Sequence, residues 1–114
     1  MMRFVIALAL TSFGAPVLAE ASKEESCRYQ GQVMAAVQKA RMDRVSKDKA
    51  ASEILASGPT WPDEYSNAIT PMVEQVYSMK RRDLRKNDLG ALFEQQCLAN
   101  WDQIQAMKKS MQSN

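Results

Sequence analysis

Histidine is absent from the 114-residue chain, and cysteine occurs only twice. Without histidine, the chain lacks the commonest general acid or base and the commonest metal ligand. Serine and threonine hydroxyls need a base held in a formed pocket, and a protein this small seldom has room for one. The sequence therefore indicates a protein that is not an enzyme, holds no cofactor or metal and acts by binding.

A large excess of charge and a long apolar run are also lacking. Fifteen lysines and arginines oppose 13 aspartates and glutamates, which gives a formal net charge of +2. This balance argues against a nucleic-acid partner. The apolar run Phe4–Leu10 is too short to cross a bilayer, which takes about 20 residues. We expect no transmembrane segment in the mature chain.

The first residues have the layout of a secretory signal peptide. Arg3 makes the start basic, Phe4–Leu10 forms the apolar centre, and small residues precede two alternative cleavage sites, after Ala19 or after Ala21. We therefore expect a signal peptide over residues 1–19 and a single domain over residues 22–114. The expected location is the bacterial periplasm or the exterior.

The two cysteines, Cys27 and Cys97, would reach an oxidising compartment on export, where a disulfide is favoured over free thiols. Closing a loop of this length stabilises the fold by roughly 4 kcal/mol. Gly31 follows Cys27 by about one helical turn. Because glycine has no side chain, we expect a partner helix to approach closely beside the disulfide.

The rest of the chain carries helix signals and no strand signals. Capping residues and apolar positions at three- and four-residue spacing predict an all-α fold, a small bundle of four helices stapled by the disulfide. Pro71 interrupts the third stripe, so that helix either kinks there or restarts with Thr70 as its cap. The expected helices run from the capping box at Ser22 to about Val45, from Asp48 to Ser57, from the cap Thr60 to Met79, and from the cap Asn87 or Asp88 to the end of the chain.

The end of the last helix is a candidate binding surface. At 1.5 Å per residue a helix of 24 residues would extend for roughly 36 Å, so its end could project beyond the bundle. An exposed apolar stripe there would be typical of a contact with a protein partner or of self-association. The stripe consists of Trp101, Ile104, Met107 and Met111.

A basic run is the second candidate site. Its five positive residues are Lys80, Arg81, Arg82, Arg85 and Lys86, opposed within the run by Asp83. Such a run could make peripheral contact with an anionic envelope component or with an acidic partner. The alternative is a solvated end of the third helix, where cations stabilise the negative end of the helix dipole.

The layout of signal peptide, early cysteine, amphipathic helix and a second cysteine on a terminal helix resembles small exported bacterial helical proteins of uncharacterised function. Two segments also resemble the Hde-type periplasmic acid-stress chaperones: 69–75, and 101–104 with Lys108 and Lys109. That resemblance implies a helical dimer that dissociates in acid and holds unfolding clients. In that family, however, the second cysteine lies near the position of Tyr77, whereas here it is Cys97.

Three functions therefore remain open at this point. The first is an envelope accessory or protein-binding module that uses its terminal helix. The second is a periplasmic acid-stress chaperone, and the third is an immunity-type inhibitor of a cell-wall-degrading toxin, because such inhibitors are also small, exported and helical.

Overall fold

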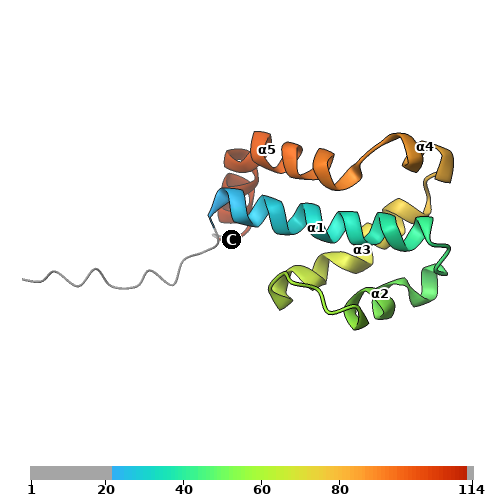
Figure 1. Cartoon of the computed structure of the whole chain (residues 1–114). Coiled ribbons are helices and arrows are strands. Elements are labelled where there is room, and N and C mark those ends of the chain that lie inside the picture. The colour runs from blue at the N-terminus through green and yellow to red at the C-terminus, as the bar shows by residue number, and fades with distance from the viewer. Residues whose placement is uncertain (1–21, 113–114) are drawn as a thin grey trace, which may run out of the picture.

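The computed structural model describes residues 22–112, so the predicted signal peptide lies outside the described residues. The elements are α1 (Lys23–Met42), α2 (Lys47–Ala56), the 3₁₀ helix η1 (Asp63–Ala68), α3 (Ile69–Tyr77), α4 (Arg81–Lys86) and α5 (Leu89–Gln112) (Figure 1). The predicted all-α fold is confirmed. The predicted number of four helices is wrong for the described chain, because the short helix α4 lies within the basic run.

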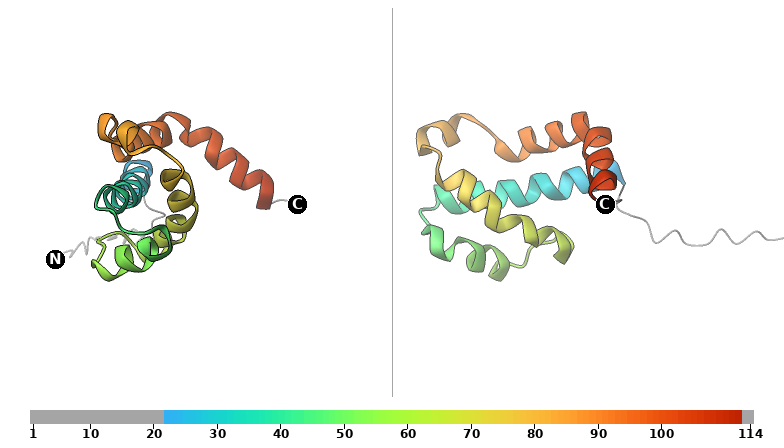
Figure 2. Two further views of the ribbon diagram at one scale, coloured as in Figure 1. Left: turned by 90° about the vertical axis from the view of Figure 1, so that its right-hand side faces the viewer. Right: turned by 180° about the vertical axis from the view of Figure 1, so that it is seen from behind.

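Helix α1 occupies the centre of the fold and contacts all the other helical elements. Helix α5 runs back along one side of α1, while α2 and α3 lie on the other side (Figure 1). Seen along α1, the C-terminal part of α5 turns away from the other helices (Figure 2). The fold therefore consists of a packed body and a partly separate terminal helix.

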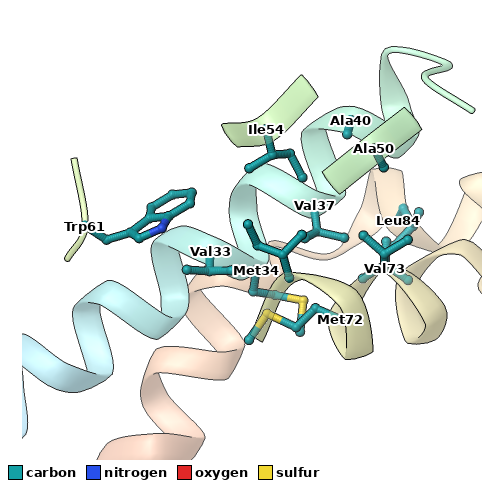
Figure 3. Close-up of a cluster of buried hydrophobic side chains, with 12 residues drawn as sticks. Val33, Met34, Val37, Ala40, Ala50, Ile54, Trp61, Met72, Val73 and Leu84 are labelled. Carbon is teal, nitrogen blue, oxygen red and sulfur yellow. The ribbon is translucent and has the colours of Figure 1, made fainter. Parts of the chain in front are cut away.

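The apolar core lies between α1, α2 and α3 (Figure 3). Helix α1 contributes apolar side chains three and four residues apart, as an amphipathic helix does. Trp61 is 9% exposed, as expected for a residue that covers the core, and its Nε1 donates to Ser66 Oγ at 3.0 Å. The buried cluster comprises Val33, Met34, Val37, Ala40, Ala50, Ile54, Trp61, Ile69, Met72, Val73, Val76 and Leu84.

Helix α5 is joined to α1 mainly through small groups. The predicted disulfide between Cys27 and Cys97 is confirmed, with 5.5 Å between the two Cα atoms. Beside it, a Cβ added to Gly31 would lie 2.8 Å from the carbonyl oxygen of Gly90, and a Cβ added to Gly90 would lie equally close to the oxygen of Gly31. The two backbones therefore touch, which confirms the close approach expected at Gly31.

Gln38 fixes the junction between α4 and α5. Its Nε2 donates to the carbonyl oxygens of Leu84 and Asn87 at 2.8 and 2.7 Å, and its Oε1 accepts from the Leu89 amide at 3.0 Å. Asp88 Oδ1 accepts from the Ala91 amide at 3.0 Å, which confirms Asp88 as a cap of the last helix. One side chain of α1 thus satisfies backbone groups that would otherwise lack partners at a helix end.

Helix α1 starts as predicted and ends earlier than predicted. The Ser22 hydroxyl accepts from the Glu25 amide at 3.2 Å. The helix stops at Met42 and not near Val45, because Arg44 adopts a left-handed conformation with φ of 64°. The Val45 amide then donates to the Ala40 oxygen and the Arg44 amide to the Arg41 oxygen, at 3.0 and 3.2 Å. This is a Schellman motif with arginine where glycine is usual.

The predicted third helix is divided in two. Residues 63–68 form η1, and α3 begins at Ile69, so Pro71 lies in the first turn of α3, where its missing amide hydrogen costs nothing. Of the two alternatives at Pro71, the restart fits, although Ala68 and not Thr70 is the cap residue. Thr60 was also wrongly predicted as a cap, because Pro62 occupies the cap position of η1.

The contact between Gly31 and Gly90 predicts whether one substitution stabilises or destabilises the fold. Gly90→Ala should destabilise the fold by about 1 to 2 kcal/mol, because the added methyl meets the Gly31 oxygen and Ala35 Cβ, at 2.8 and 2.9 Å. Helix propensity alone predicts the opposite, a gain of about 1 kcal/mol. Urea unfolding of the mature protein measures the difference. The control is Ala91→Gly at the exposed neighbouring position, which measures the effect of helix propensity alone. A Gly90→Ala protein that is more stable than the wild type would contradict the contact.

The strained Arg44 predicts a stabilising change. Arg44→Gly should raise the free energy of unfolding by about 1 kcal/mol, because glycine adopts the left-handed conformation without a Cβ penalty. Arg44→Ala removes the same charge and keeps the strain, so it isolates the backbone effect. Thermal or urea unfolding of the three proteins checks this, and equal gains in both variants would attribute the effect to charge alone.

Candidate functional site

The free end of α5 follows from the way α5 pairs with α1. The two helices are antiparallel, and their fixed points are Gly31 against Gly90 and Cys27 against Cys97. Only four residues of α1 precede Cys27, whereas α5 continues to Gln112. Beyond about Trp101, therefore, α5 has no counterpart in α1. At 1.5 Å per residue this end extends for roughly 16 Å.

The four predicted binding residues differ in exposure along this end. Trp101 and Ile104 are half-buried, while Met107 and Met111 are 64% and 70% exposed. Because Ile104, Met107 and Met111 are spaced by three and four residues, they lie on one face of α5. The structure therefore presents a short apolar stripe that becomes more exposed toward the C-terminus.

Trp101 lies in a groove under this end of α5. The open cavity has a volume of about 860 Å³, and its walls come from the start of α1, from η1 and from α5. Tyr65 and Glu64 of η1 face its α5 side, which consists of Trp101, Gln105, Lys108 and Lys109. Ile104, Met107 and Met111 are not among the lining residues. The four predicted residues thus divide into one that faces a groove of mixed polar and apolar lining and three on the apolar stripe.

The basic run lies at the other end of the molecule, near the end of α1 (Figure 1). Lys80 precedes α4, Arg81 and Arg82 occupy its first turn, and Arg85 and Lys86 its last. The alternative interpretation, cations at the end of the third helix, is therefore wrong for Arg81 and Arg82. Helix α3 already ends at Tyr77, and these two residues start a new helix, where the dipole disfavours positive charge.

Two further arginines, Arg41 and Arg44, join the basic run from the end of α1. Arg41 Nη2 donates to the carbonyl oxygen of Met79 at 3.3 Å, and its guanidinium lies 5.2 Å from the centre of the Tyr77 ring. Burial and the charges of Arg44, Arg41 and Arg85 lower the pKa of Arg81. The sequence showed only the contiguous run, since the arrival of α1 beside α4 is a tertiary contact.

Tyr77 connects α3 to the turn after α1 and to Arg41. Its hydroxyl donates to the Val45 carbonyl oxygen at 2.8 Å, and its ring faces Arg41. Burial raises the pKa of Tyr77, and Glu53 acts in the same direction, while the charges of Arg41 and Arg81 lower it. The phenol therefore stays protonated at neutral pH and links α3 to the turn after α1.

No family model, curated protein or solved structure matches the chain. The resemblance to the Hde-type chaperones therefore stays a prediction that rests on the two short segments. Among residues 22–112, none of the helices combines the length and the apolar character that crossing a membrane requires.

The pairing of α5 with α1 predicts that the end of α5 is dispensable for folding. Every residue of the buried cluster lies before Cys97, and the exposed stripe follows it. A mature chain truncated after Gln103 should stay folded and lose at most about 1 kcal/mol, as expected for mostly exposed positions. Circular dichroism during urea unfolding measures this. Loss of the cooperative transition would show that residues 104–114 belong to the core.

Proposed function

We propose that the chain is an exported, non-enzymatic protein-binding module whose contact surface is the free end of α5. The observation that supports this most directly is the exposure of Met107 and Met111 on a helix that continues past its partner helix. Methionine side chains are flexible and polarizable, and they are common on surfaces that bind helices of other proteins. The proposed stripe for the contact is Ile104, Met107 and Met111.

The disulfide and the predicted signal peptide support export. The bond between Cys27 and Cys97 is of the kind that persists in oxidising compartments. Cleavage after Ala19 or Ala21 would leave at most two residues before Ser22, too few to cover the end of α5. The stripe would then be open in the mature protein.

The charges beside the stripe define the partner that we propose. Lys108 and Lys109 are exposed on the same end of α5, and both line the groove beside the stripe. An apolar face bordered by carboxylates would complement both features, and charge complementarity would also speed association. The proposed partner is therefore a protein with an acidic, amphipathic helix or groove.

The experiment compares two double variants of the mature protein. Met107→Ser/Met111→Ser removes the stripe, while Leu55→Ser/Leu92→Ser removes two other exposed apolar side chains, which are 51% and 43% exposed. A partner isolated from periplasmic extract and purified should bind the first variant at least about tenfold more weakly than the wild type, because central apolar contacts carry most of the binding energy. It should bind the second variant like the wild type.

Other outcomes of this experiment would replace the proposal. Equal binding of both variants would exclude the stripe as the contact. Self-association in sedimentation that the first variant abolishes would make a second copy the occupant. Protection of a client from aggregation at about pH 2 to 3, where carboxylates are protonated, without any partner at neutral pH, would favour the chaperone function. Inhibition of a cell-wall-degrading enzyme by the chain would favour the immunity function.

A further inference from the structure

The corner between the end of α1 and α4 concentrates positive charge beyond what the basic run suggests. Arg41 lies in the last turn of α1 and Arg44 just after the helix ends, while Arg81 and Arg85 lie one turn apart on α4. Helices α1 and α4 contact each other, and Arg41 binds the carbonyl oxygen of Met79, two residues before Arg81. The charges of Arg41, Arg44 and Arg85 all act on Arg81, so four arginines from two segments lie close together.

This cluster is only weakly compensated by acidic side chains. The ion pairs found in the described part of the chain are Lys39 with Asp43 and Lys47 with Glu74, and neither includes an arginine of the cluster. The Nε atoms of Arg41 and Arg81 are inaccessible to solvent and have no hydrogen-bond partner among the described residues. Glu53 acts on the neighbouring Tyr77, and the charges that lower the pKa of Arg81 are all arginines. Positive charge thus accumulates where part of its hydration is lost.

The side chain of Arg41 and the backbone of Arg44 are held in place. Arg41 is fixed by the Met79 carbonyl and by the Tyr77 ring, and Tyr77 is fixed by Val45. Arg44 occupies a left-handed position, φ 64°, at which an arginine is less favourable than glycine. Backbone strain of this kind is typical of functional positions. A guanidinium that is already fixed, as that of Arg41 is, loses less side-chain entropy on binding than a flexible one.

We propose that Arg41, Arg44, Arg81 and Arg85 form a binding site for a phosphate group. The planar guanidinium donates two parallel hydrogen bonds to an oxyanion, and a compact group with several charged oxygens can contact more than one arginine. The convergence of the four arginines favours such a group over an acidic peptide, whose carboxylates are spread along a chain. The phosphate can be that of a small soluble molecule or of a lipid headgroup.

The test uses two double variants of the mature protein that each remove two exposed positive charges from this end. Arg44→Gln/Arg85→Gln removes two members of the proposed site. Arg82→Gln/Lys86→Gln removes two equally exposed residues of the same run that do not belong to it. Isothermal titration calorimetry with pyrophosphate at constant ionic strength gives the affinities, and flotation with phosphatidylcholine vesicles with or without phosphatidic acid tests the lipid source.

We expect the wild type to bind pyrophosphate, phosphatidic acid vesicles or both. The probe that binds shows whether the phosphate group belongs to a soluble molecule or to a lipid headgroup. The Arg44→Gln/Arg85→Gln protein should bind about tenfold more weakly, the loss of at least one charge-assisted contact. The Arg82→Gln/Lys86→Gln protein should bind within about twofold of the wild type, as expected for screened surface charges.

Three outcomes of this comparison would overturn the proposal, and a fourth comes from a further variant. They are no binding of either probe by the wild type, equal losses in the two double variants, and binding of hexaglutamate as tightly as pyrophosphate. Arg44→Gly separates binding from folding, because it should be more stable than the wild type and still bind pyrophosphate more weakly. Unchanged pyrophosphate affinity in this variant would also count against the site.

Discussion

The contact of the α1 backbone with the α5 backbone is the constraint on which the rest of the structure depends. Gly31 and Gly90 allow the two chains to touch, and the disulfide between Cys27 and Cys97 holds the helices at this distance. Because backbone atoms and the disulfide form the contact between α1 and α5, α5 adds few large side chains to the apolar core. The body of the protein is therefore built on α1, α2 and α3.

The pairing of α1 with α5 also determines what lies at the two ends of the molecule. Since residue 27 faces residue 97, the C-terminal part of α5 has to pass the start of α1, and the apolar stripe with the groove around Trp101 results. At the opposite end, Gln38 holds the residues between α4 and α5, which keeps α4 beside the end of α1. The basic corner and the free helical end thus depend on one helix pairing, although they lie far apart in the fold (Figure 1).

Local signals were sufficient for much of the fold. The cap residues Ser22 and Asp88, the disulfide and the close approach at Gly31 could be predicted, because each depends on a short segment or on the two cysteines alone. The end of α1 could not, because Arg44 takes a conformation that its residue type disfavours. The start of α4 within the basic run also went against the expected dipole preference, and it accompanies the burial of Leu84 in the apolar core.

The two candidate sites were predictable to different degrees. The three- and four-residue spacing of Ile104, Met107 and Met111 indicated a continuous stripe, but only the pairing with α1 shows that Trp101 faces a groove instead. For the proposed arginine site, the sequence indicated residues 80–86. It gave no reason to add Arg41 and Arg44, which are nearly 40 residues earlier. Their approach depends on the contact of Arg41 with Met79 and Tyr77.

The small share of α5 in the apolar core has a consequence for the way the molecule opens. Cooperative units of a protein separate where few apolar contacts connect them. Helices α1 and α5 share the most extensive helix contact of the described chain, but few large apolar side chains take part in it, and one covalent bond crosses it. A reducing environment would remove this covalent restraint, and only the packing and hydrogen bonds of α5 on α1 would then hold the last helix to the body. The amide hydrogens of the two parts would then exchange at different rates.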